Sequence, residues 1–174
     1  MGDSPLPAPA APLAARFTDL LWGYQRTQLL YAAAVLGLAD LLVEGPRAVA
    51  ELAVATETHA PSLARLLRAL TAHGLFTERD DGQFALNPLA ALLQTNTPGS
   101  LRAMVLAEAG DLYPIWGELL HSVRTGETAF EHLHGMTNWE YRERHAEVNA
   151  RFNAYMGDLV QDQATLFGRV RWSS

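Results

Sequence analysis

The fold of this chain is decided by residues 45–88, GPRAVAELAVATETHAPSLARLLRALTAHGLFTERDDGQFALNP. The stretch predicts a helix, a turn, a second helix and a hairpin, which is the order of a winged helix-turn-helix. Pro46 is placed to open the first helix, because proline is tolerated at the first helical position. Pro61 opens the second helix, whose apolar residues recur at the spacing of one helical face: Leu63, Leu66, Leu67 and Leu70.

The end of the second helix and the hairpin have local signals of their own. Gly74 is predicted to end the helix, because glycine adopts the left-handed conformation of a C-terminal cap without steric strain. Residues 75–79 and 83–86 flank Asp80-Asp81-Gly82, a sequence typical of a hairpin turn. We therefore expect a small β wing directly after the second helix.

A winged helix often binds DNA, but the charge of this one argues against that function. Residues 46–88 contain four arginines and five carboxylates, a net charge of −1, and the wing tip carries Asp80 and Asp81. Arg65 and Arg68 lie on the second helix, without the Asn or Gln that reads adenine. The whole chain has 13 basic and 19 acidic residues, which is unfavourable for binding phosphates. We expect no nucleic-acid partner, and interpret both arginines as solvated or paired with nearby acids.

Composition limits the other function classes. The chain has 174 residues and no cysteine, which excludes disulfides and thiolate metal sites. The longest apolar run, residues 29–39, is shorter than the roughly 18 residues of a membrane span. Residues 1–12 are rich in Pro and Ala and lack the basic start of a signal peptide, so we expect a flexible tail. Together these features predict a cytoplasmic protein with no membrane partner.

Two helices are predicted before the winged segment, at residues 13–22 and 26–42. The second is apolar on nearly every side and therefore needs to be covered on several faces. Trp22, Tyr24 and Tyr31 add amphipathic rings of the kind enriched at interfaces. We interpret these helices as a subunit interface; the alternative is a central core helix in a monomer.

The remainder of the chain is predicted to be helical, in one domain that extends from residue 13 to residue 174. Its elements are a short helix at 88–93, a loop at 94–99, helices at 101–110 and 111–124, a loop or turn of helix at 128–138, and one long helix at 139–166. On the long helix the charged side chains are interpreted as a solvated face with i,i+4 support: Glu140, Arg142, Glu143, Arg144, Glu147 and Arg151.

His132-x-His134 is the only histidine pair with a spacing that would fit a metal. The segment has no H-E-x-x-H pattern, and the chain has no cysteine to complete a site. We therefore expect no metal.

Five segments, taken in their order, carry a resemblance to a known family. From about residue 13 onward the chain resembles the N-terminal region of class I small-molecule O-methyltransferases, both the plant caffeic-acid type and the bacterial enzymes that tailor aromatic polyketides and other antibiotics. The segments are YAAAVLGLADLLVEGPRAVAELA (31–53), PSLARLLRALTAHGLF (61–76), FALNPLAALL (84–93), SVRTGETAFEHLHGMTNWEY (122–141) and RFNAYMGDL (151–159).

The resemblance implies a mostly α fold and a homodimer. In that family the region is a dimerisation domain built on a winged helix-turn-helix with a small β-hairpin, plus N-terminal dimerisation helices and a long C-terminal helix. It binds no DNA, and it roofs the substrate pocket of a catalytic domain. The implied function is dimerisation and substrate capping in an O-methyltransferase that acts on an aromatic small molecule.

The family's cofactor site belongs to a catalytic domain that opens with a strand and a turn of the V-D-V-G-G-G type. Backbone amides of that turn approach S-adenosylmethionine. Residues 167–174 stand about where the strand would begin, and the family's catalytic histidine lies further on. The resemblance thus implies no cofactor and no catalytic residue in this chain, and no methyl transfer by it alone. A truncation, a proteolytic fragment and a natural stand-alone protein are equally open.

In the related enzymes an F-N-x-x-M segment of the long helix faces the substrate. Here it supplies Phe152, Asn153, Tyr155 and Met156. An aromatic ring and a flexible thioether four residues apart suit a planar aromatic ligand, although Met156 alone fits plain helix packing equally well. The plant pattern continues to a serine where this chain has Val160, so we expect no cofactor contact from this side.

Two further sets of residues are candidates. By the resemblance, the helices that carry Met104, Tyr113 and Trp116 form the pocket roof; without it, these three are ordinary core. A stand-alone natural-product enzyme or ligand-binding protein that reuses the pocket is the alternative function. As an enzyme it would need acid and base groups there: His121, His134 or Glu108.

Overall fold

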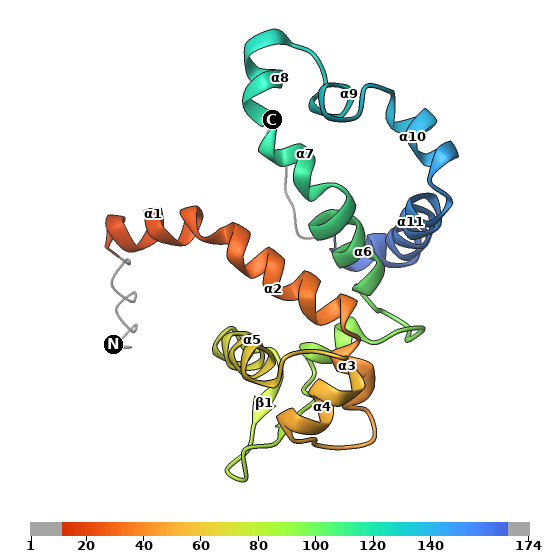
Figure 1. The fold of residues 1–174 in the computed structure, drawn as a ribbon. Helices are drawn as coiled ribbons and strands as arrows, with labels where there is room; N and C mark the ends of the chain where they lie inside the picture. Colours follow the sequence, from red (N-terminus) through yellow and green to blue (C-terminus); the bar gives the residue numbers. More distant parts are fainter. Residues whose placement is uncertain (1–11, 167–174) are drawn as a thin grey trace, which may run out of the picture.

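A computed structural model describes residues 12–166 of the chain, with side chains as far as Gly157. A winged helix lies at one end and a curved row of helices at the other, and α1 and α2 form an arm between them (Figure 1). The predicted tail falls outside the described residues except for Pro12, and so does the side chain of Val160. None of the described helices combines the length and hydropathy that a membrane crossing requires.

The helices follow one another closely along the chain, and two of the short ones are not α-helical. A 3-10 turn, η1, follows the wing, and a π-helix, η2, continues α6. The elements are α1 (Leu13–Leu21), α2 (Gly23–Val35), α3 (Leu38–Leu41), α4 (Val49–Ala55), α5 (Ala60–Ala72), β1 (Thr77–Glu78), β2 (Phe84–Ala85), η1 (Ala90–Leu93), α6 (Arg102–Leu106), η2 (Ala107–Asp111), α7 (Tyr113–Gly117), α8 (Leu119–Thr125), α9 (Ala129–His134), α10 (Asn138–Arg144) and α11 (Ala146–Leu166).

The second helix of the winged motif and its hairpin are confirmed. Pro61 lies in the first turn of α5, and Gly74 follows the helix with a φ of 82°. Three leucines of the stripe on α5 are buried, with Leu67 fully inaccessible to solvent, and Leu66 is partly buried against them. Strands β1 and β2 are antiparallel, with Thr77 opposite Ala85. The leucine stripe therefore packs into the core from which the wing projects.

The predicted start of the first winged helix is wrong by three residues. Pro46 does not open it, because Arg47 is extended and pairs with Phe84 through N–H···O bonds of 3.0 and 2.9 Å. Helix α4 begins at Val49, where the Glu51 carboxylate accepts the Ala48 N–H at 3.0 Å. The segment before the helix is thus tied to the wing.

Three helices that the sequence predicts as continuous are each broken in two. Gly37, at a φ of 62°, separates α2 from α3, because the left-handed conformation cannot continue a helix. At Glu118 an i→i−3 hydrogen bond to Ile115 tightens the chain between α7 and α8. His145, with φ −123° and ψ 82°, separates α10 from α11.

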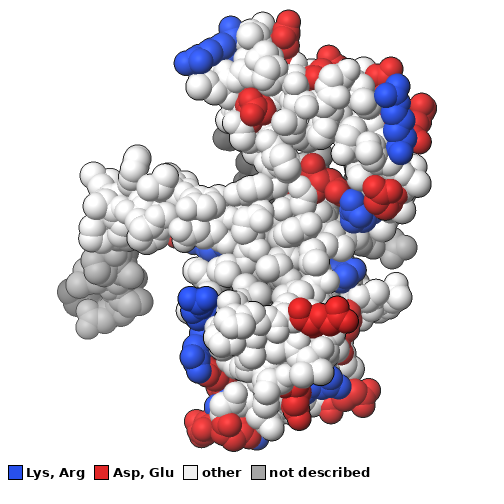
Figure 2. All heavy atoms as spheres, in the orientation of Figure 1, with Lys and Arg blue, Asp and Glu red and all other residues white. Residues whose placement is uncertain are grey.

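The hydrophobic core lies within the winged half of the molecule. Its buried residues come from α2 to α5, the wing and η1, and include Leu38, Leu52, Phe76 and Phe84. Helix α1 contributes no buried residue. The arm that α1 and α2 form shows an almost uncharged surface on the face seen in Figure 2.

Candidate functional site

The charged side chains of the wing are largely paired with one another. Arg68 Nε lies 3.2 Å from Glu78 Oε1, and Arg79 Nε lies 3.7 Å from Asp81 Oδ2. Arg65 donates to the Ser62 hydroxyl. Red and blue atoms mix over the winged helix in Figure 2. The predicted pairing with nearby acids is confirmed for Arg68, and the visible face presents no basic surface suited to phosphates.

The π-helix η2 connects the arm to the last helix. The Leu112 N–H reaches back five residues to the Ala107 carbonyl at 2.9 Å, which widens the turn. Such turns are frequent at functional sites, because they reorient side chains within an otherwise regular helix. Here η2 directs two carboxylates, Glu108 and Asp111, toward α11.

Both carboxylates of η2 bind residues of α11. Arg151 donates from Nε and Nη2 to Asp111 Oδ2 and Oδ1, at 2.8 and 2.6 Å, in a two-pronged ion pair that raises the pKa of Arg151. The Tyr155 hydroxyl donates to Glu108 Oε1 at 3.1 Å. Burial, and then this hydrogen bond, raises the pKa of Tyr155, so its hydroxyl remains a donor at neutral pH. These bonds fix α11 across η2.

On its other side η2 packs closely against α2. Gln28 Nε2 donates to the Ala109 carbonyl at 3.0 Å. A Cβ built on Gly110 would lie 2.6 Å from Tyr31 Cε2 and 3.2 Å from its Cζ. The Tyr31 ring therefore occupies the space that any side chain at position 110 would need.

Gly110→Ala is expected to destabilise the chain by about 1–3 kcal/mol, because the Tyr31 ring must move to admit the methyl group. Urea denaturation measures the change. The penalty should shrink by about 1 kcal/mol in a Tyr31→Ala background, as expected for residues in contact. Gly117→Ala is the matched control, since nothing lies within 4 Å of its added Cβ. An equal penalty in both backgrounds would contradict the assigned contact.

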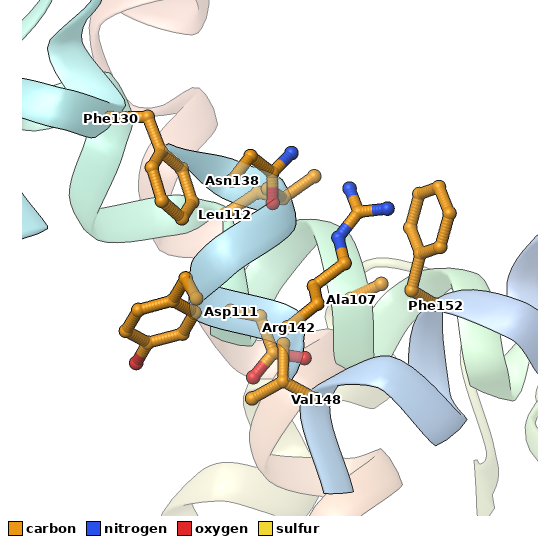
Figure 3. A pocket seen from close by; sticks show the side chains of 9 residues that line it. Ala107, Asp111, Leu112, Phe130, Asn138, Arg142, Val148 and Phe152 are labelled. Carbon is orange, nitrogen blue, oxygen red and sulfur yellow. The ribbon is translucent and has the colours of Figure 1, made fainter. Parts of the chain in front are cut away.

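A small cavity lies where η2, α9, α10 and α11 meet (Figure 3). Its free volume is about 40 Å³, enough for water but far below the several hundred Å³ of a site that encloses an aromatic ligand. Its lining combines aromatic, aliphatic and charged side chains: Ala107, Asp111, Leu112, Phe130, Asn138, Tyr141, Arg142, Val148 and Phe152.

Arg142 is the cationic residue in the lining of this cavity. It is only 9 % exposed, and its guanidinium carbon lies 3.3 Å from the centre of the Phe152 ring and 5.3 Å from that of Trp139. Burial lowers the pKa of Arg142. The prediction that Arg142 belongs to a solvated charged face is therefore wrong. The same prediction is incomplete for Arg151, because the guanidinium of Arg151 forms an ion pair with Asp111.

The four residues of the F-N-x-x-M segment have different surroundings. Phe152 lines the cavity, whereas Tyr155 is bound to Glu108. Asn153 and Met156 are exposed on α11. The structure therefore does not bring the four together around this cavity.

The three predicted roof residues lie on α6 and α7, and none of them lines this cavity. Met104 and Tyr113 are partly buried, and Trp116 is 64 % exposed. Residues that the sequence did not single out form most of the lining, among them Asn138 and Val148. The capping box of α10, in which Thr137 and Glu140 exchange hydrogen bonds, was the available signal for the start of that helix.

Aromatic rings and histidines pack together behind the cavity. The ring centre of His134 lies 4.6 Å from that of Phe130 and 4.4 Å from that of Tyr141, which in turn stacks on His145 at 4.1 Å. Burial lowers the pKa of His134, and the charge of nearby His145 lowers it further. The folded state thus prefers the neutral form of His134.

This preference predicts acid sensitivity with a definite sign. The stabilisation is complete above the ordinary histidine pKa of 6.5 and is lost as the pH falls through the lower folded-state pKa of His134. His134→Phe keeps the ring contacts without a proton. Between about pH 7.5 and about pH 5, the urea midpoint should therefore fall less in His134→Phe than in the wild type. His73→Gln, in an exposed turn, is the control; equal losses in His134→Phe and the wild type would contradict the prediction.

Two further histidines, His121 and His132, form a separate pair. His121 stacks on His132 with ring centres 3.7 Å apart, and their Nε2 atoms lie 3.3 Å from Glu127 and 3.7 Å from Glu118. His132 and His134 thus have different neighbours. In the described part of the chain, no three His, Asp or Glu residues are grouped to hold a metal ion.

The three acid and base candidates are also dispersed. His121 stacks on His132, His134 packs among aromatic rings, and Glu108 accepts the Tyr155 hydroxyl. None of the three lines the cavity beside Phe152. Their arrangement brings no acid and base pair to one reacting position there.

Comparison with known proteins identifies the family to which this chain is similar. Residues 18–96 match the sequence model of the O-methyltransferase dimerisation domain. The chain is 42 % identical over 146 residues to the phenazine O-methyltransferase PhzM of Lysobacter antibioticus, an alignment that covers 84 % of this chain and 43 % of that protein. It is 35 % identical over 154 residues to the O-demethylpuromycin-O-methyltransferase of Streptomyces alboniger, covering 88 % and 41 %.

Solved structures agree with the sequence matches. The crystal structure of LaPhzM superposes with a TM-score of 0.85 at 38 % identity, over 94 % of this chain and 49 % of that one. The O-methyltransferase NcsB1 from neocarzinostatin biosynthesis, in complex with S-adenosyl-L-homocysteine and 1,4-dihydroxy-2-naphthoic acid, gives 0.72 at 31 % identity, over 95 % and 50 %.

The chain therefore belongs to the O-methyltransferase dimerisation-domain family. The two curated relatives named above are bacterial O-methyltransferases, and the chain spans less than half the length of each. The resemblance read from the sequence and the mostly α fold are both confirmed.

Proposed function

We propose that this chain forms a homodimer through α1 and α2, and that α6 to α11 roof the substrate pocket of a natural-product O-methyltransferase. The observation that carries the proposal is the α1 arm. Leu13 and Leu20 are each 81 % exposed, and Phe17 is 71 % exposed, although all three are large apolar side chains. A contiguous apolar helix face of this kind is typical of a surface that another chain covers.

Two of the three charged side chains on the arm, Asp19 and Arg26, pair with each other. Arg26 Nη1 lies 2.6 Å from Asp19 Oδ1, and its other Nη donates to the Asp19 carbonyl. The hydrogen bond from Arg26 lowers the pKa of Asp19, which keeps the pair ionised together. A self-paired charge leaves the apolar residues of α1 free to determine association. A second copy of the same chain is the occupant that the dimerisation-domain match supports.

For the roof, we propose the aromatic contacts that the sequence predicted. Phe152 supplies a ring at the cavity, and the other proposed contacts lie outside its lining, on α6, α7 and α11: Met104, Tyr113, Trp116, Asn153, Tyr155 and Met156. The ligand of NcsB1 named above is a planar aromatic acid, which supports an aromatic substrate here. The whole enzyme's substrate would lie beneath these helices.

S-adenosylmethionine supplies the methyl group in the enzymes of this family. Its recognition calls for a glycine-rich turn between a strand and a helix, where backbone amides can approach the ligand. The strands within residues 12–166 form an antiparallel hairpin, and its turn leads from strand to strand. These residues do not fit the cofactor, so we derive no chemical step through it.

The dimer can be tested directly by multi-angle light scattering across a dilution series. We expect twice the mass of one 19.0 kDa chain at concentrations of about 10 µM and above. A single-chain mass throughout the range would overturn the proposed dimer, whatever is found for ligand binding.

A further inference from the structure

Arg142 holds a charge that the described structure leaves without an anionic partner. The residue as a whole is 9 % exposed, and its guanidinium forms no ion pair or side-chain hydrogen bond within residues 12–157, although none of its nitrogen atoms is fully sealed from solvent. Its neighbours are the faces of Phe152 and Trp139. A charge that is largely removed from water is stabilised by a hydrogen-bonded anion. Such a group beside a cavity is therefore a candidate for binding an anion.

The acids around Arg142 are engaged elsewhere. Asp111 lines the same cavity, but both of its oxygens are bound by Arg151. Glu140, on the same helix, accepts the backbone N–H and the hydroxyl of Thr137. Glu143 is exposed on the helix surface. The cavity therefore retains the positive charge of Arg142, because the charge of Asp111 is balanced.

The geometry around Arg142 suits a flat anion. Asn138 lies one turn earlier on α10 and lines the cavity, so its amide can add a donor beside the guanidinium fork. Figure 3 shows the guanidinium between Asn138 and the ring of Phe152. The fork matches both oxygens of a carboxylate, and the Phe152 ring offers a face for stacking.

We propose that Arg142 and Asn138 bind the carboxylate of a planar aromatic acid, whose ring takes the place of the guanidinium on Phe152. The free volume of about 40 Å³ implies that Arg142 swings away from Phe152 when the ligand enters. The described arrangement is thus the closed form, in which the guanidinium covers the ring itself. This assignment rests on the proposed roof function and specifies its substrate class.

The test compares two probes of nearly equal shape, 2-naphthoate and uncharged 2-naphthamide, by isothermal titration calorimetry on the whole chain. The wild type should bind the naphthoate at least about tenfold more tightly, as expected for a charge-assisted pair. Arg142→Met keeps the length and the contact with Phe152 but removes the charge, so the preference should disappear. Arg142→Lys keeps the charge without the fork, and should retain only part of the preference.

Arg144→Met is the matched control, because Arg144 is exposed on the same helix and should leave the preference intact. Circular dichroism and light scattering establish that each variant is folded and dimeric. Equal affinity of the wild type for both probes, or a preference that survives in Arg142→Met, would overturn the anion site and leave the aromatic roof standing. Binding of neither probe to a folded dimer would overturn the anion site and the roof together, while the dimer would stand.

Discussion

Leu67→Asp is expected to abolish the folded state of this chain. The Leu67 side chain is fully buried in the cluster that joins α5 to α2, α3 and the wing. Loss of the leucine alone should remove about 2–5 kcal/mol, and an unpaired buried carboxylate adds several kcal/mol more. The sum approaches or exceeds the whole stability of a typical domain, about 5–15 kcal/mol. Circular dichroism during urea titration should show no cooperative transition.

Val54→Asp is the matched control, because it places the same carboxylate in the same winged segment. Val54 lies on α4 and is 80 % exposed, so the change should alter the free energy of unfolding by less than about 0.5 kcal/mol. If Leu67→Asp unfolded cooperatively within about 1 kcal/mol of the wild type, the winged segment would not be what holds the dimer arm and the roof together.

The sequence predicted the winged segment well because its determinants are local. The spacing of the α5 leucines, Gly74 after the helix and the Asp80-Asp81-Gly82 turn each act within a few residues. The start of α4 was misplaced because Arg47 pairs with Phe84, 37 positions further along the chain. Local signals such as Pro46 cannot register a contact of that range, and tertiary pairing overrode the helix-start preference.

The candidate site was harder to predict than the fold, for a related reason. A single helix over residues 139–166 would place Arg142 on the same charged surface as its neighbours. The break at His145 turns α11 relative to α10, and Arg142 then faces the ring of Phe152. Phe152 itself was singled out through the family resemblance, whereas Arg142 was assigned to solvent. Whether an arginine is solvated or buried depends on where its helix ends and on what packs against it.

The π-helix η2 also depends on contacts between residues that are distant in the sequence. Helical periodicity predicted residues 101–110 as an ordinary helix, but the chain widens at Ala107 and directs Glu108 and Asp111 toward α11. Tyr155 lies 47 residues after its partner Glu108, and Arg151 lies 40 residues after its partner Asp111. A helix–helix crossing of this kind is fixed by side-chain pairs that only the folded chain brings together.

The double substitution Phe17→Asp and Leu20→Asp is expected to convert the proposed dimer to a monomer. Both side chains are exposed in the single chain, so a carboxylate at either position is solvated there. In the dimer, each carboxylate would be buried against the apolar arm of the partner, without a compensating cation. Loss of two central apolar contacts should raise the dimer dissociation constant at least about 100-fold. Light scattering over a dilution series measures this change.

The single chain gives an independent check on the cause of that dissociation. Helix α1 contributes no residue to the core, so the doubly substituted chain should keep the helical circular dichroism of the wild type. Val54→Asp again serves as the control, because it adds a carboxylate to an exposed apolar site on α4 and should leave the dimer mass unchanged. A double variant that remains dimeric would show that the subunits associate through another surface. The exposed apolar face of α1 would then need a different occupant.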